Sequence, residues 1–214
     1  MNLKSLIIVD YGVGNFRSVQ KAFAAVGVDA PITGDPADID AADAVILPGV
    51  GAFGDAIHNL RRRNLEAPLL RAAQQGKPFF GICVGMQLLF EQSDEMGLHT
   101  GLGLLPGYVT RFKEGLTAPQ MGWNQIEPAG QHPLLAGVSF GDFAYFAHSY
   151  YCVPQNPAHI IARTDYHGHF VSAVAKDNIF GIQFHPEKSQ QVGLRILKNF
   201  AELVIAQKNK GQNL

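Results

Sequence analysis

The sequence is 214 residues long, and 47% of these residues are hydrophobic. A chain of this length and composition can bury a full apolar core, which favours a single domain over 1–214 rather than two small ones. The formal net charge is −1 and only 16% of the residues are charged. These values exclude the broad basic surface with which proteins bind nucleic acids or anionic membranes.

The apolar run near the N-terminus, Leu6–Val9, stops at Asp10. This run is too short for the core of a signal peptide or for a membrane span, so we expect a cytoplasmic protein. Two cysteines, Cys83 and Cys152, could in principle pair. A secreted chain of this size that depends on disulfides would normally carry more cysteines, so we expect two free thiols.

The first half of the chain alternates short apolar runs with helical patterns, which indicates parallel strands joined by crossover helices. Strands are predicted at 6–9, 44–47 and 79–82. Helices are predicted at 15–26, at 56–75 with a second helix starting at Pro68, and from Cys83 as far as the polar group 92–94. Gly27 provides a stop for the first helix.

The second half contains short strand-like runs separated by turn residues, which predicts antiparallel hairpins. These runs are 108–112, 124–126, 143–146, 150–153, 160–164, 170–174 and 179–184. A last helix is predicted at 192–205, followed by a polar segment, 208–214, that we expect to fray.

Cys83 lies between two glycines in the segment Gly81-Ile-Cys-Val-Gly85, directly after an apolar strand. A nucleophile on a sharp turn between strand and helix is exposed at the carboxyl end of the strand, and small neighbours allow this turn to close. The helix N-terminus and an adjacent imidazolium would favour the thiolate. Packing as a small hydrophobe is the ordinary alternative for a cysteine.

His185 is the histidine whose position fits a general base. It follows the predicted strand 180–184 and precedes Pro186 and Glu187, so a base and a carboxylate leave the sheet together. A Cys-His-carboxylate set uses the acid to orient the imidazole and to favour its charged form. Although Cys83 is distant in sequence, both residues would project from the same rim of a doubly wound sheet, where ligands of such folds bind.

The loop Pro48-Gly-Val-Gly51 leaves a third strand on the same rim. Its glycines allow a backbone N–H group to turn towards the oxyanion that forms when a thiolate attacks a carbonyl. Val50 and Val84 are therefore the candidate oxyanion-hole residues. A plain turn is the alternative for this loop.

No metal site is expected. His167 and His169 resemble a two-ligand fragment, but no further ligand has a recognisable spacing. No other motif points to a cofactor.

Together these motifs resemble the class I glutamine amidotransferases, in which the P-G-V-G loop, the G-I-C-V-G elbow and an F-H-P-E segment occur in this order. The resemblance covers essentially the whole chain. Within that class the sequence is similar to the glutaminase subunits of imidazole glycerol phosphate synthase. The motifs are D-Y-G-V-G-N at 10–15, M-G-W-N at 121–124, H-S-Y-Y at 148–151 and F-G-I-Q-F-H-P-E-K-S at 180–189. Only Phe16, where leucine is expected, departs from the pattern.

The resemblance implies an α/β three-layer sandwich with an open, mostly parallel twisted sheet, a flavodoxin-like core and an added antiparallel strand region. It also implies hydrolysis of L-glutamine to glutamate and ammonia. Cys83 would attack the carboxamide, His185 would protonate the departing ammonia and then activate water, and Glu187 would orient His185. Further residues would hold the amino-acid end of the substrate: Gly51, Gln87 and the backbone of His148, Ser149 and Tyr150.

The resemblance further implies a heterodimer with a cyclase subunit that uses the ammonia in histidine biosynthesis. Met121 and the single tryptophan, Trp123, are residue types enriched at the centres of interfaces, although a core tryptophan is equally compatible with the sequence. The resemblance favours the interface and adds Asn15 to it. A docked partner would also keep ammonia from being protonated in bulk water.

Two other hypotheses compete with this one. The chain could be the amidotransferase subunit of another pathway, such as pyridoxal phosphate or anthranilate synthesis, but the segments 10–15 and 121–124 argue against it. A binding or redox-sensor protein with a cysteine elbow is a rival of a different class. His185 and Glu187 argue against that rival, because a sensor thiol does not require a general base with an orienting acid.

Overall fold

The computed structural model describes residues 6–113 and 115–211. Its first half contains β1 (Leu6–Val9), α1 (Phe16–Ala25), β2 (Ile32–Thr33), α2 (Pro36–Ala41), β3 (Ala44–Gly49), α3 (Phe53–Arg62), α4 (Glu66–Gln74), β4 (Phe79–Cys83), α5 (Val84–Gln87), β5 (Phe90–Ser93) and β6 (His99–Thr100). The second half contains β7 (Leu105–Arg111), β8 (Gln120–Pro128), β9 (Asp142–His148), β10 (Tyr150–Pro154), β11 (Ile160–Asp165), β12 (His169–Lys176), β13 (Ile179–Ile182) and α6 (Gln190–Gly211). Short 3-10 helices lie at Pro133–Leu135, Pro157–His159 and Pro186–Lys188.

The strands form one extended sheet in the order β2-β1-β3-β4-β13-β12-β10-β7-β5-β6. The five strands from β2 to β13 are parallel to one another. β12, β10 and β7 continue the sheet in antiparallel pairs, and the hairpin β8-β9 is attached through β11. The sequence therefore predicted the parallel first half and most of the antiparallel second half correctly. β13 is the exception, because it was expected among the hairpins but pairs in parallel with β4 as well as antiparallel with β12.

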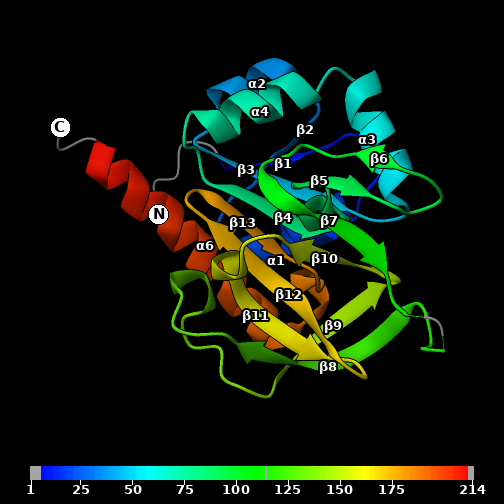
Figure 1. Cartoon of the computed structure of the whole chain (residues 1–214). Coiled ribbons are helices and arrows are strands. Elements are labelled where there is room, and N and C mark those ends of the chain that lie inside the picture. The colour runs from blue at the N-terminus through cyan, green and yellow to red at the C-terminus, as the bar shows by residue number, and fades with distance from the viewer. Residues whose placement is uncertain (1–5, 114, 212–214) are drawn as a thin grey trace.

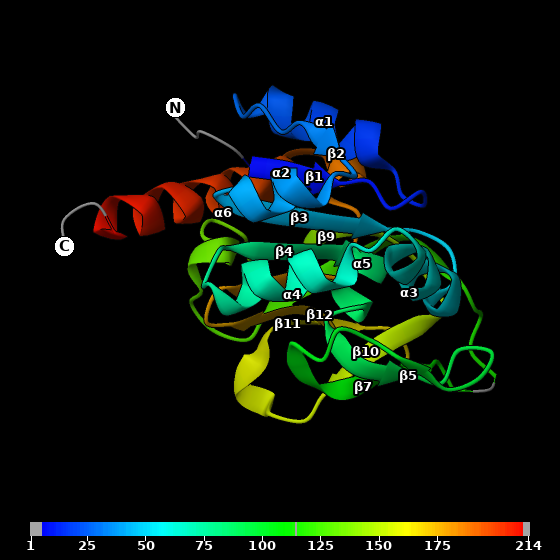
Figure 2. The same cartoon turned by 90° about the horizontal axis from the view of Figure 1, so that it is seen from above.

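Helices cover both faces of the parallel strands, so the core has three layers (Figures 1 and 2). α2 and α4 pack against each other on one face, and α1 and α6 pack together on the other. β3 and β4 are buried along their whole length, as expected for central parallel strands that are covered on both sides. The three-layer α/β architecture agrees with the predicted fold class.

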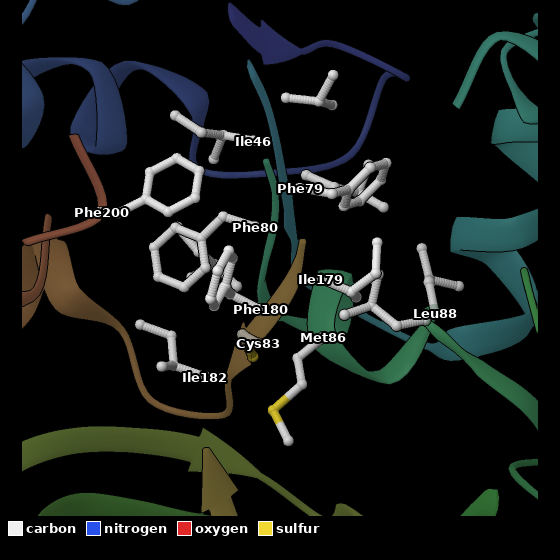
Figure 3. Packing of buried hydrophobic residues seen from close by; sticks show 14 of the residues in the cluster. Ile46, Phe79, Phe80, Cys83, Met86, Leu88, Ile179, Phe180, Ile182 and Phe200 are labelled. Atoms are coloured by element: carbon white, nitrogen blue, oxygen red, sulfur yellow. The ribbon is translucent and has the colours of Figure 1, made fainter. Parts of the chain in front are cut away.

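Aromatic packing beneath the elbow holds α6 against the centre of the sheet. The rings of Phe80 on β4 and Phe200 on α6 are stacked with their centroids 4.7 Å apart, and Phe180 on β13 meets Phe200 edge-on. Figure 3 shows these rings in one cluster with Ile182, next to Cys83 at the end of β4. The strand ends that carry the candidate site are thus supported by closely packed side chains.

Several predicted boundaries were wrong. The helix after Cys83 ends at Gln87 rather than near residue 92, because the chain turns at Leu88 and Leu89 into β5, which pairs with β7. The second helix of the pair at 56–75 starts at Glu66, so that Pro68 lies in its first turn. β2, α2 and β6 are short elements that the sequence pattern did not reveal.

The C-terminal helix is longer than predicted. α6 continues through 208–211, where fraying was expected, and Lys208 Nζ lies 2.7 Å from Asp43 Oδ2 at the edge of the sheet. The rest of the predicted frayed segment, 212–214, lies outside the described residues. Both cysteines are free, as predicted. Cys83 is only 2% exposed, although a nucleophile on such a turn was expected to be exposed, because the neighbouring segments pack closely over the end of β4. None of the helices within 6–113 and 115–211 is long and apolar enough to cross a bilayer.

The elbow at Cys83 closes only because its neighbours are glycines. A Cβ atom on Gly85 would lie 1.7 Å from the carbonyl oxygen of Leu47 on β3, and one on Gly81 would lie 2.6 Å from the carbonyl oxygen of Gly85. Both contacts are with backbone atoms, which cannot rotate away. The predicted need for small residues on either side of Cys83 is therefore met by direct backbone contact between α5 and the sheet.

The substitution Gly85→Ala should destabilise the protein, because α5 would have to move away from β3. We expect a loss of about 1–3 kcal/mol in the free energy of unfolding, as for other overpacked positions. Gly130→Ala is the matched control, since a Cβ atom there meets nothing within 4 Å. Urea unfolding of both variants measures the difference, and equal stabilities would contradict this account of the elbow.

Candidate active site

The carboxyl ends of three neighbouring parallel strands meet at one point. The register pairs Gly49 on β3 with Cys83 on β4, and Ile82 on β4 with Ile182 on β13. The next residues along β13 lead directly to His185. The structure thus brings together the three segments that sequence analysis placed on a common rim.

Cys83 has the backbone conformation of a strained turn. Its φ of 56° and ψ of −115° lie outside the regions that a non-glycine residue prefers. Such strain persists only where the surroundings impose it, and it is found at nucleophile elbows between a strand and a helix. Val84 is the first residue of α5, so its N–H group lies beside the sulfur-bearing residue.

His185 stands between Cys83 and Glu187. It interacts electrostatically with Cys83, and its Nδ1 donates to Glu187 Oε1 over 2.9 Å. The side chains of His185 and Glu187 are 5% and 1% exposed, so the pair is shielded from water. Cys83, His185 and Glu187 therefore lie together beyond the ends of β4 and β13.

The electrostatic interactions within the site favour the charged forms of His185 and Glu187. Burial by itself lowers the pKa of His185, but hydrogen bonds and charges of Cys83 and Glu187 outweigh it and raise this pKa to about 10. Burial raises the pKa of Glu187, whereas the His185 hydrogen bond and charge lower it, and the net change is downward. At neutral pH the site therefore holds an imidazolium beside an ionised Glu187.

Asn15 binds the same oxygen of Glu187 as His185 does. Its Nδ2 donates to Glu187 Oε1 at 3.2 Å and helps to lower the pKa of that carboxyl. Sequence analysis placed Asn15 at the partner interface, and the structure shows that it also touches the candidate triad. Asn15 precedes α1 directly, so the loop from β1 to α1 takes part in the site.

The loop after β3 lies against the elbow. An added Cβ atom on Gly49 would be 2.8 Å from Gly85 N and 2.9 Å from Val84 Cβ, so the two candidate oxyanion segments are in contact. Val50 is 38% exposed, and Gly51 has a φ of 86°. The loop that carries Val50 thus lies at the surface above the nucleophile.

The predicted substrate-binding segment 148–150 approaches α5 through Gln87. Gln87 Nε2 donates to the carbonyl oxygen of Tyr150 at 3.0 Å, and His148 Nδ1 contacts the same oxygen at 2.8 Å. The carbonyl oxygen of Ser149 accepts from Phe112 N at 3.0 Å. Gln87 is 2% exposed, so it is a buried amide rather than a helix-surface one.

His148 is buried among the rings of Phe112, Phe146 and Phe170. Burial lowers its pKa to about 4, with a smaller contribution of the same sign from the charge of His185. His148 therefore stays neutral at physiological pH. Its side chain supports the segment 148–150, and it lies apart from the line formed by Cys83, His185 and Glu187.

Three residues near the site were missed by sequence analysis. Tyr11, two residues after the end of β1, is fully buried, and its hydroxyl lies over Gly49. Burial and the charge of Cys83 raise its pKa well above the usual range. Gln183 donates from Nε2 to Cys83 Sγ at 3.8 Å. A lone polar residue between Ile182 and Phe184 in an apolar strand was the signal that could have identified it.

Glu95 is the third missed residue. Its Oε2 accepts from Phe53 N at the start of α3, at 2.7 Å, and its charge acts on Tyr150. Glu95 also lines a cavity of about 460 Å³ together with residues of α3 and the loop before it. The carboxylate thus contacts the start of α3 and lies within electrostatic reach of Tyr150, and no sequence motif marks it.

Exposed apolar side chains gather on the hairpin β8-β9. Met121, Trp123 and Phe143 are 68%, 46% and 50% exposed. Trp123 contacts the ring of Tyr145 edge-on, and the backbone carbonyl of Tyr145 accepts from His185 N at 2.9 Å. The core position that was the alternative for Trp123 is therefore wrong, and the apolar patch adjoins the candidate triad.

Residues 7–203 match the model of the family "Glutamine amidotransferase class-I". The chain belongs to the class I glutamine amidotransferase family. The imidazole glycerol phosphate synthase subunit HisH of Syntrophotalea carbinolica is 49% identical over 205 residues, covering 92% of this chain and 100% of the relative. That of Salinibacter ruber is 51% identical over 203 residues, covering 92% and 93%. The predicted family, and the predicted group within it, are confirmed.

The fold of this amidotransferase recurs in solved structures. A crystal structure of a glutamine amidotransferase has a TM-score of 0.75 at 20% identity, covering 94% of this chain and 99% of the other. PurLQS from Thermotoga maritima has a TM-score of 0.73 at 20% identity, with coverages of 95% and 98%. These likenesses confirm the predicted fold class, including its flavodoxin-like core.

Replacing Cys83 with alanine should lower the pKa of His185. The substitution removes the hydrogen bond and charge of the sulfur, so that Glu187 alone opposes the effect of burial. We expect the titration midpoint of His185 to move from about 10 towards the neutral range. NMR titration of carbon-13-labelled histidine measures this shift.

Cys152→Ala is the matched control for that titration. It removes the other buried thiol, which is not among the groups that shift the His185 pKa. An unchanged His185 midpoint in the Cys83→Ala protein would show that sulfur and imidazole are not coupled.

Proposed function

We propose that this amidotransferase hydrolyses L-glutamine with Cys83 as nucleophile, His185 as general acid and base, and Glu187 as the carboxylate that orients His185. The chain is the glutaminase subunit of imidazole glycerol phosphate synthase and acts in histidine biosynthesis. The residue assignment rests on two observations: Cys83 acts electrostatically on His185, and His185 is hydrogen-bonded to Glu187. We expect the reaction to take place in the cytoplasm.

The reaction follows from the charged state of the site. The Cys83 thiolate attacks the carboxamide carbon of glutamine, and His185 gives its proton to the departing nitrogen, which leaves as ammonia. The resulting thioester is hydrolysed by a water molecule from which His185 removes a proton, releasing glutamate and restoring the thiolate. Glu187 remains ionised throughout and stabilises the imidazolium.

Backbone N–H groups of Val50 and Val84 would stabilise the oxyanion of each tetrahedral intermediate. A single donor of this kind is worth about 3 kcal/mol of transition-state stabilisation. The contact between the two segments at Gly49 and Gly85 supports this assignment. Cys83 is only 2% exposed, so glutamine reaches the sulfur only when a segment around the elbow moves.

The amino-acid end of glutamine would be held by Gly51, Gln87, Glu95 and the segment 148–150. Glu95 offers a negative charge to the α-ammonium group, and it lies within electrostatic reach of Tyr150. Backbone groups of Gly51 and of the segment 148–150 complete the pocket. No cofactor is required by this chemistry.

We further propose that the cyclase subunit docks on the patch formed by Met121, Trp123 and Phe143 and on Asn15. Exposed aromatic side chains are typical of interface centres, and this patch contacts the triad through Tyr145. Asn15 gives a second link, because it donates to Glu187. The heterodimer would pass ammonia to the cyclase without exposing it to bulk water.

Cys83 should be the only cysteine that a glutamine analogue with an electrophilic carbon labels. Cys152 is fully buried and burial raises its pKa well above the usual range, so it remains an unreactive thiol. The Cys83→Ala protein should lose glutamine-dependent turnover, whereas the complex should retain synthesis from added ammonia. Peptide mass spectrometry and both turnover assays test this assignment, and equal labelling of the two cysteines would refute it.

The isolated subunit should hydrolyse glutamine slowly, because the loop of Val50 rests with its N–H group turned away until the partner and its nucleotide bind. The motivating observation is the exposed Val50 beside Gly51, whose positive φ allows the peptide to rotate. Glutamate release is measured for the chain alone and with cyclase and nucleotide. Equal rates in the two assays would reject the proposal.

Trp123→Ala tests the docking surface in the same assay, since it should raise the cyclase concentration needed for half-maximal stimulation. Tyr108→Ala on β7 is the matched control, because Tyr108 is 45% exposed, close to the 46% of Trp123, and lies outside the patch. Similar effects of the two substitutions would place the partner elsewhere.

A further inference from the structure

A chain of three side-chain hydrogen bonds reaches Cys83 from the side of Gln87. Gln183, the first residue after β13, is fully buried. Its Nε2 lies 3.8 Å from Cys83 Sγ, and its Oε1 lies 3.2 Å from Gln87 Nε2. Gln87 Nε2 in turn donates to the carbonyl oxygen of Tyr150 at 3.0 Å. The assigned triad does not use this chain of contacts.

The backbone carbonyl of Tyr150 determines the orientation of the side-chain amides of Gln87 and Gln183. The Tyr150 oxygen can only accept, so Gln87 must turn its NH₂ group towards it. The second hydrogen of that NH₂ group needs an acceptor, which is Gln183 Oε1. The NH₂ group of Gln183 therefore faces Cys83 Sγ. If the side-chain amide of Gln183 were rotated by 180°, its NH₂ group would face the NH₂ group of Gln87 and its carbonyl oxygen would face the Cys83 sulfur. Both contacts would leave buried polar groups without hydrogen bonds, which costs free energy of folding.

A fixed N–H donor next to sulfur stabilises the thiolate form of a cysteine more than its thiol form. A thiol is a weak acceptor, whereas a thiolate accepts a hydrogen bond strongly. The Gln183 amide can therefore stabilise a thiolate by a directed hydrogen bond without adding a charge.

We propose that Gln183 is a positioning residue with two functions: its NH₂ group holds the Cys83 sulfur as a thiolate, and its carbonyl oxygen fixes the carboxamide of Gln87 for glutamine binding. This inference rests on the proposed function of Cys83 as nucleophile and extends it to a residue outside the triad. Because different atoms of Gln183 serve the two functions, substitutions separate them.

Gln183→Glu keeps an oxygen acceptor for Gln87 but replaces the donor facing sulfur with a carboxylate. We expect the rate of Cys83 alkylation by iodoacetamide at pH 6 to fall about tenfold or more, as for the loss of a hydrogen bond to a charged group. The KM for glutamine in the complex with the cyclase should stay within about twofold of wild type, because the Gln87 contact remains.

Gln183→Met has a similar shape but neither donor nor acceptor. It should reduce Cys83 alkylation to a similar extent and also raise the KM for glutamine several-fold, since Gln87 loses its partner. Ser172→Ala on β12 is the matched control. Ser172 is buried, its hydroxyl has no hydrogen-bond partner among the described residues, and its carbonyl accepts from Gln183 N. Both readouts should be unchanged in that variant.

Wild-type alkylation rates in both Gln183 variants would overturn the proposal. Thermal unfolding checks each variant, and if Gln183→Met does not fold, an unchanged alkylation rate in Gln183→Glu is sufficient to overturn it. The reactivity of Cys152 in the wild-type protein serves as the internal reference. If Cys83 of the wild-type protein is alkylated no faster than Cys152, the proposed function itself fails. If wild-type Cys83 is reactive and the Gln183 variants react at the same rate, only the inference about Gln183 fails.

Discussion

The register of three parallel strands is the constraint on which the candidate site depends. β3, β4 and β13 end side by side, and each end delivers one part of the chemistry: the loop of Val50, the thiol of Cys83 and the pair His185–Glu187. A shift of one residue in β4 would turn the Cys83 side chain to the opposite face of the sheet. Backbone contact between Gly85 and Leu47 fixes the elbow over this register.

Burial sets the electrostatic properties of the site. His185 and Glu187 are almost completely withdrawn from water, and each has its charge stabilised by the other. In such an environment opposite charges interact more strongly than at the surface, although desolvation alone would disfavour both of them. The neutral groups around the line, Asn15 and Gln183, add directed hydrogen bonds without adding charge.

The apolar patch and the triad are physically continuous. Trp123 contacts Tyr145, whose backbone accepts from His185 N and whose N–H donates to Ser189 Oγ. Ser189 Oγ also donates to the carbonyl oxygen of His185 at 2.6 Å. A partner that covers the hairpin β8-β9 would therefore press on the segment that carries the proposed general base, which gives docking a direct mechanical route to catalysis.

The sequence by itself determined the parallel and antiparallel halves, the elbow at Cys83, and the His185–Glu187 pair, because each is encoded locally by periodicity or by adjacent residues. It could not place the end of α5 or reveal β2 and β6, since these depend on pairing with distant strands. Sequence analysis also missed Gln183, Glu95 and Tyr11 as site residues, although the polar Gln183 in an apolar strand gave a signal. Only the tertiary structure decided their roles, because their partners lie far away in sequence and are brought within hydrogen-bond or van der Waals distance by the sheet.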